Sequence, residues 1–277
     1  MLALRQGHAL AVLLKVAQLS RSTFYYQVTA QQAGDPHAEL KAHIRRVYEY
    51  HKGRYGYRRI TAALRQAGQA VNHKAIQRLM QMMGLKSLVR PKKYRAYRGQ
   101  QATVPNLLAR QFQADQPNQK WVTDVTEFNV RGEKLYLSPV MDLYNGEIVS
   151  YSMQQQPQFS LVSNMLKQAL AKLGRHQAPI LHSDQGWQYQ MSAYQLQLAA
   201  RGLTQSMSRK GNCLDNAAME SFFGTLKSEF FYLSQFESIE HLQEGIHQYI
   251  HYYNHERIRI KLKGLSPVQY RNQALLT

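Results

Sequence analysis

The spacing of apolar residues changes along the chain, from the period of helices in the first third to that of strands after residue 120. Residues 1–34 predict two short helices joined by a turn, the second beginning at an N-cap at Ser20. Residues 35–86 predict three more helices, whose apolar faces hold Leu40, Ile44 and Val47, then Tyr57, Ile60 and Leu64, then Ile76, Leu79 and Met80. Both segments are expected to be small all-α modules of the helix-turn-helix type.

After residue 120 the chain predicts a mixed α/β domain. Runs rich in Val, Leu, Phe and Tyr indicate strands at 121–130, 135–144 and 146–153, with a hairpin turn at Asn145-Gly146. Helices expected at 160–173 and 192–201 alternate with strands at 179–181 and 203–207. We therefore expect a five-stranded mixed sheet with flanking helices over residues 117–235, preceded by a basic linker at 87–116 and followed by a helical tail at 236–277.

Positive charge is concentrated in the first part of the chain, whose formal net charge is +18. Residues 1–115 hold 20 Lys and Arg against 4 Asp and Glu, whereas residues 116–277 hold 15 against 13. Such asymmetry is typical of a protein that binds a polyanion, although a solvated basic surface is the simpler alternative. We expect DNA contacts from Arg54, Arg58, Arg59, Lys74 and Arg78 of the helical unit, from Arg90, Lys92, Lys93 and Arg95 of the linker, and from Arg209, Lys210 and Asn212 of a later loop.

Cysteine content and hydropathy exclude several classes of protein. Cys213 is the only cysteine, so the chain forms no internal disulfide and no zinc site with two or more thiolates. No apolar run is long enough to cross a bilayer. We expect a cytoplasmic protein that acts on nucleoid-bound DNA.

Three acidic residues stand where a strand ends or on a helix. Asp124 interrupts an apolar run, Asp184 follows the strand at 179–181, and Glu220 lies in a helix that also carries Lys227. Oxygen-only ligands suit Mg²⁺ or Mn²⁺, which leave open positions for phosphate oxygens and water. Three converging carboxylates would therefore support phosphodiester chemistry, with Lys227 placed to contact a phosphate.

Other acids compete with these three. Asp142 occupies a comparable strand position to Asp124, whereas Glu127 is sent to the opposite face by pleat alternation. Asp215 and Glu229 are the alternatives to Glu220, and a helix-capping role explains Asp215 fully. Glu220 and Lys227 could also be solvent-exposed charges of little consequence.

The segments around the acids resemble those of a known family. They are WVTDVT at 121–126, LHSDQG at 181–186, SMSRKGNCLDNA at 206–217 and ESFF at 220–223, with 35 residues between Asp184 and Glu220. Together they resemble the OrfB-type DDE transposases of bacterial insertion sequences, in the integrase-core group. GRYGYRRI at 53–60 looks like the helix-turn-helix segment of that family. The tail from Tyr252 through Arg257 to Pro267 looks like its C-terminal motif, with Arg259 where many relatives carry histidine.

The resemblance implies an RNase H-like fold with Asp124, Asp184 and Glu220 as the catalytic, metal-binding triad, and two Mg²⁺ or Mn²⁺ ions per site. It implies cleavage at the terminal inverted repeats of an insertion sequence and strand transfer into target DNA. A homo-oligomer on DNA is expected, with an upstream OrfA-type protein as a separate partner or frameshift fusion. The alternatives are an RNase H-like nuclease without joining activity and a DNA-binding regulatory subunit with a silent core.

Overall fold

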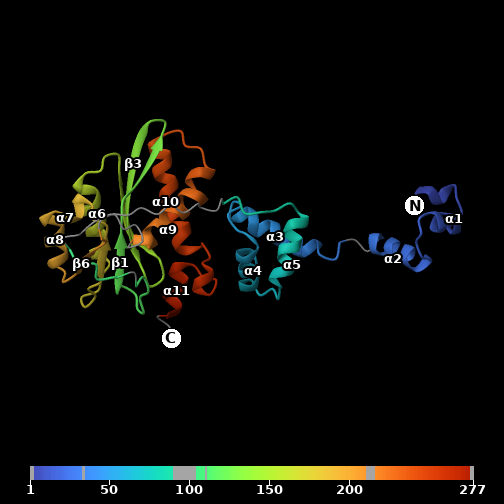
Figure 1. The fold of residues 1–277 in the computed structure, drawn as a ribbon, viewed down its shortest axis with the longest axis horizontal. Helices are drawn as coiled ribbons and strands as arrows, with labels where there is room; N and C mark the ends of the chain where they lie inside the picture. The colour runs from blue at the N-terminus through green and yellow to red at the C-terminus, as the bar shows by residue number, and fades with distance from the viewer. Residues whose placement is uncertain (1–2, 33–34, 90–103, 110, 210–215, 275–277) are drawn as a thin grey trace.

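The computed structural model describes residues 3–32, 35–89, 104–109, 111–209 and 216–274. At the N-terminus a short 3-10 helix, η1 (Ala3–Gln6), precedes α1 (Leu10–Val16) and α2 (Arg21–Gln32), which lie at one end of the molecule, away from the sheet (Figure 1). The Thr23 amide donates to the Ser20 hydroxyl at 3.1 Å, which confirms the predicted N-cap.

The next three helices form a compact unit with its own core. They are α3 (Ala38–Tyr50), α4 (Tyr57–Gln66) and α5 (His73–Met82), and they bury Ile44, Ile60 and Ile76 completely. The Asn72 side chain caps α5 by accepting from the Lys74 amide at 2.9 Å. Gly84, at φ +69°, follows the end of the helix, where glycine adopts this left-handed conformation without strain.

Strand β3 (Glu133–Asp142) pairs with other strands along both of its edges. One edge pairs antiparallel with β4 (Ile148–Gln154); the other pairs antiparallel with both β1 (Lys120–Thr123) and β2 (Thr126–Val130). β1 also pairs parallel with β5 (Ile180–Ser183), which pairs parallel with β6 (Thr204–Met207). The observed sheet is thus a mixed one, as predicted.

The sheet has six strands instead of five, because the run predicted at 121–130 is broken. β1 ends at Thr123 and β2 begins at Thr126, yet both lie along the same edge of β3. Asp124 and Val125 fill the interruption. The sequence hid this break because the residues on both sides are equally apolar and favour strands.

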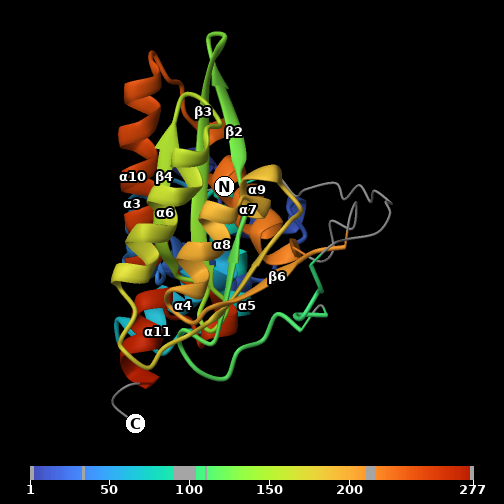
Figure 2. The same cartoon turned by 90° about the vertical axis from the view of Figure 1, so that its left-hand side faces the viewer.

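Helices cover both faces of the sheet (Figure 2). One core contains α6 (Phe159–Ala171), the short α7 (Trp187–Gln190), which the sequence analysis missed, and α8 (Ser192–Ala199). The other contains α9 (Ala217–Glu229) and α10 (Ile239–His255). Trp121 enters the first core and Val122 the second, as strand alternation requires. The short 3-10 turns η3 (Phe231–Leu233) and η4 (Ile260–Leu262) and the helix α11 (Pro267–Ala274) complete the tail.

The carboxylate of Glu229 joins the helical unit to the sheet domain. It accepts two hydrogen bonds from Arg257 at 2.7 Å, one from Arg59 at 3.1 Å and one from the Tyr249 hydroxyl at 3.0 Å. The Glu229 backbone carbonyl accepts a further bond from Arg54 at 2.9 Å. Burial alone would raise the pKa of Glu229, but these arginines outweigh it and lower that pKa. The residue is therefore a buried anion neutralised by arginines from two domains.

Glu229→Gln should lower the free energy of unfolding by about 3–5 kcal/mol, because it leaves the buried Arg257 without its counter-charge. Urea denaturation measures the loss. The exposed Glu237→Gln on the same part of the chain is the control and should change stability by less than about 0.5 kcal/mol. Equal stability of the two variants would show that the Glu229 charge is dispensable.

Candidate active site and nucleic-acid contacts

Asp124 lies at the break between β1 and β2. Its side chain accepts a hydrogen bond from the Val125 amide at 2.8 Å, which fixes the carboxylate at the point where β1 leaves the sheet. The preceding residue, Thr123, is fully buried, whereas Asp124 is half-buried. The carboxylate thus sits where the strand end opens to solvent.

Asp184 lies beside Asp124 in the sheet order. β1 and β5 run parallel with Val122 opposite His182, so continuing the register places Asp184 opposite Asp124 at the same edge. The Gly186 amide donates to Asp184 at 2.9 Å. The carboxyl ends of parallel strands are where α/β sheets gather ligands.

Glu220 comes from the first turn of α9, whose start is tied to β1. The Asn216 side chain donates to the Thr123 carbonyl at 3.2 Å, so the helix begins against the strand end that carries Asp124. Three segments far apart in sequence therefore bring a carboxylate to one region.

The charges of these acids act on one another. Burial, then the charge of Asp184 and then that of Glu220 raise the pKa of Asp124 to about 7, against the opposing Val125 hydrogen bond. Burial also raises the pKa of Asp184. The same two aspartates add to the effect of burial in raising the pKa of the buried Tyr189, which the sequence analysis did not single out.

The donor set fits a hard divalent cation, since it consists of carboxylates and a cation would relieve their repulsion. As they stand, however, no three acidic, histidine or cysteine side chains among the described residues are close enough together to hold a metal ion. Asp124, Asp184 and Glu220 thus lie in one region of the molecule, but too far apart to bind one metal ion together.

The competing acids have structural partners. Asp142 is fully buried, pairs with Arg271 at 2.5 Å and accepts from the backbone amides of Asn118 and Tyr144. Glu127 is exposed and pairs with Lys134 at 3.2 Å. Glu229 is held by the arginines described above. His182 lies within β5 and is buried, with its ring nitrogens hydrogen-bonded to the hydroxyls of Ser206 and Ser208. These bonds account for the histidine as a residue of the core.

The predicted DNA contacts divide into groups. Arg58, Lys74, Arg78 and Arg209 are exposed, and the Lys227 ammonium lies 5.2 Å from the centre of the Phe128 ring. For Arg54 and Arg59 the structure corrects the prediction, because Arg54 is buried and both bind Glu229 across the domain interface. The remaining predicted DNA contacts lie outside the described residues: Arg90, Lys92, Lys93, Arg95, Lys210 and Asn212. Cys213 and Asp215 also lie outside them.

The sequence analysis also missed the structural partners in the tail. Arg257 and Arg271 neutralise the buried Glu229 and Asp142, and Tyr249 and Asn254 bond to Glu229 and to the Ile148 backbone. The only signal was the tail motif that contains Arg257, which gave no indication of its partner. Among the described residues, no helix is both long and apolar enough to cross a membrane.

Family models match most of the chain. An HTH-like domain matches residues 36–93, and two integrase core domain models match residues 114–213 and 220–275. Integrase core domains carry out phosphoryl transfer on DNA and typically use a divalent metal ion. The integrase core model at residues 114–213 covers the strands that precede Asp124 and Asp184, and the model at residues 220–275 begins at Glu220. These matches agree with the RNase H-like fold that was expected.

Curated relatives match over nearly the whole length. The putative transposase InsK for insertion sequence element IS150 of Escherichia coli (strain K12) is 54% identical over 99% of this chain and 97% of its own. The transposase InsF for insertion sequence IS3A of the same organism is 33% identical over 96% of this chain and 95% of its own. Among solved structures, the HTLV-2 integrase catalytic core domain in complex with magnesium (trimeric form) aligns at 18% identity and a TM-score of 0.47, covering 57% of this chain and 99% of that chain. The chain therefore belongs to the family of insertion-sequence transposases of the IS150 and IS3 kind, which join an HTH-like domain to an integrase core domain.

Proposed function

We propose that this transposase cleaves DNA at the ends of its insertion sequence and joins those ends to a target, with Asp124, Asp184 and Glu220 as the catalytic acids. The proposal rests on one observation. Carboxylates that follow β1 and β5 and one from α9 lie in one region, where burial and the charges of Asp184 and Glu220 raise the pKa of Asp124. Acids so arranged cost folding free energy, and a metal-dependent reaction explains why they are there.

We propose that two Mg²⁺ or Mn²⁺ ions bind these acids. When bound, such ions activate an attacking oxygen and stabilise the leaving oxygen of an in-line displacement. Since the three side chains as they stand are not close enough together to hold a metal ion, the acids have to draw together for the ions to bind.

Hydrogen bonds within the chain hold the proposed catalytic acids in position. The amides of Val125 and Gly186 orient the two aspartates, and the Asn216 bond to β1 holds the start of α9 against them. No covalent protein–DNA intermediate is required. The same acids can therefore serve hydrolysis at an element end and later transesterification, with water and then a 3′-hydroxyl as the attacking group.

The partners we propose are the terminal inverted repeats, target DNA, further copies of this chain and an upstream OrfA-type protein or fusion segment. One relative supports a longer active species. The probable transposase for insertion sequence element IS1353 of Shigella flexneri is 40% identical over 98% of this chain, but the match covers only 53% of that protein. Nucleoid association in the cytoplasm follows from a DNA substrate and belongs to the same proposal.

Asp124→Asn and Glu220→Gln should each abolish cleavage and joining while leaving DNA binding within about twofold, because each removes a proposed metal ligand but no phosphate contact. The assay uses labelled duplexes from the DNA that flanks the gene, with a target duplex and Mg²⁺ or Mn²⁺. Glu127→Gln, an exposed acid paired with Lys134, is the matched control and should keep full activity.

The products decide between the candidate functions. Joined products identify a transposase, and cleavage without joining a nuclease. Metal-independent binding without cleavage identifies a regulatory subunit. Normal strand transfer by either acid variant would overturn the assignment of these residues.

Asp124→Asn should also stabilise the metal-free protein above pH 7. Because the pKa of Asp124 is raised from 3.8 to about 7, the folded protein binds this proton more tightly than the unfolded chain does. The free energy of unfolding therefore falls as the pH rises from about 4 to 7, and the variant should escape roughly 1–3 kcal/mol of that loss.

Urea unfolding at pH 4 and pH 8, without metal, measures the difference between parent and variant. They should be equally stable at the lower pH and differ at the higher one. Adding Mn²⁺ should raise the melting temperature of the parent but not of Asp124→Asn. A variant no more stable than the parent at either pH contradicts the electrostatic account.

A further inference from the structure

A hollow of about 590 Å³ lies between α4 of the HTH-like domain and the tail turn at residues 260–264. We call it the α4–tail hollow. Four basic or imidazole side chains line it, and no carboxylate does: Arg58, Arg65, His73 and Lys263. Two segments some 200 residues apart therefore build one positively charged surface.

The tail turn is fixed against α4. The Gln66 side chain donates to the Gly264 carbonyl at 2.8 Å, and the Gly264 backbone lies so close to Ala62 that an added Cβ would contact the Ala62 methyl at 3.5 Å. Backbone bonds between Arg259 and Leu265 close the turn on itself. Lys263 adopts a left-handed conformation, φ +56°, which directs the chain back toward α4. The turn is thus a built part of the surface and not a loose end.

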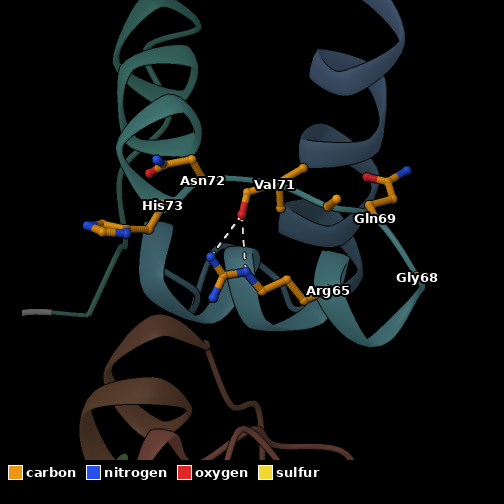
Figure 3. A pocket seen from close by; sticks show the side chains of 7 residues that line it. Arg65, Gly68, Gln69, Val71, Asn72 and His73 are labelled. Atoms are coloured by element: carbon orange, nitrogen blue, oxygen red, sulfur yellow. Dashed lines mark hydrogen bonds between the residues drawn. The ribbon is translucent and has the colours of Figure 1, made fainter.

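Within the part of the chain that the structure describes, the charges in the hollow have no counter-charge. Arg65 donates twice to the Val71 carbonyl, at 3.1 and 2.9 Å, as Figure 3 shows, and Arg58 donates to the Tyr57 hydroxyl at 3.1 Å. These neutral acceptors hold the guanidinium groups in place without cancelling their charge. None of the ion pairs within the described ranges includes Arg58, Arg65 or Lys263.

Three arginines elsewhere in the molecule are paired with acids. Arg59 and Arg257 are neutralised by Glu229, and Arg271 by Asp142 and Glu147. Acids thus neutralise these three arginines, whereas no acid among the described residues lines the hollow. A general excess of basic residues does not account for this division, whereas an external polyanion does.

We infer that the α4–tail hollow holds the phosphodiester backbone of duplex DNA, with Lys263 of the tail as a phosphate contact in addition to Arg58 and Arg65 of the HTH-like domain. The hollow lies next to the start of α5, whose exposed Lys74 and Arg78 are placed to meet the same duplex. Backbone contacts of this kind set the position of a protein on DNA without reading sequence. The inference rests on the proposed function only in taking DNA as the substrate.

The test measures binding to two duplexes, one from the DNA that flanks the gene and one of scrambled sequence, over a range of salt concentrations and without metal. Lys263→Gln should lower the slope of log binding constant against log salt by about 0.9, and Lys263→Gln with Arg58→Gln by about 1.8, equally for both duplexes. The exposed Lys167→Gln on α6, on the far face of the sheet, removes the same charge and should leave the slope unchanged.

Two results would overturn the inference. One is an unchanged slope for Lys263→Gln in a variant that keeps the parent's melting temperature. That result would favour an acidic protein, and not DNA, as the partner of the hollow. The other is an equal change for Lys167→Gln. Cleavage and joining by the parent are assayed in parallel with Mg²⁺. A parent that cleaves while the Lys263→Gln slope is unchanged refutes this inference alone, whereas a lowered slope in a protein that never cleaves refutes only the proposed function.

Discussion

The relative position of the two domains depends on the ion pairs that the buried carboxylate of Glu229 makes with arginines. A buried carboxylate is costly unless its charge is matched and its oxygens are bonded. Here the matching groups come from separate segments: Arg257 follows α10, and Arg59 belongs to the HTH-like domain. Around this centre the Tyr55 hydroxyl accepts from the Ile258 amide at 2.8 Å, and the Arg54 guanidinium lies over the Tyr249 and Tyr252 rings. A hydrophobic contact alone would allow the two domains to slide, whereas this set of bonds defines one relative position.

The same helix carries the proposed catalytic acid and the domain contact. Glu220 is in the first turn of α9 and Glu229 is its last residue, about 13 Å further along the helix axis. The HTH-like domain is therefore attached, through a rigid element, to one of the three acids that we propose as metal ligands. DNA held by that domain stands in a fixed relation to Glu220, while Asp124 and Asp184 belong to the sheet.

Much of this could be predicted from sequence because the evidence was local. The helical periods, the Ser20 cap and the end of the strand before Asp184 all follow from residues within a few positions of each other. The role of Arg54 and Arg59 could not be predicted in this way. A basic residue in a helix-turn-helix segment normally faces solvent, and its actual partner, Glu229, lies some 170 positions away. A separation of 129 positions likewise hid the pairing of Asp142 with Arg271, without which Asp142 and Asp124 looked alike.

The interruption between β1 and β2 constrains how this gene can change. Because both strands pair with one edge of β3 and every other residue of β2 is buried, the two residues between the strands keep β2 in phase with the sheet. Losing a single codon there would turn Phe128 and Val130 away from the α9–α10 core and bring Glu127 and Asn129 into it. Surface loops tolerate insertions and deletions, but the two-residue connection between β1 and β2 does not. The gene can therefore change there only by substituting one residue for another.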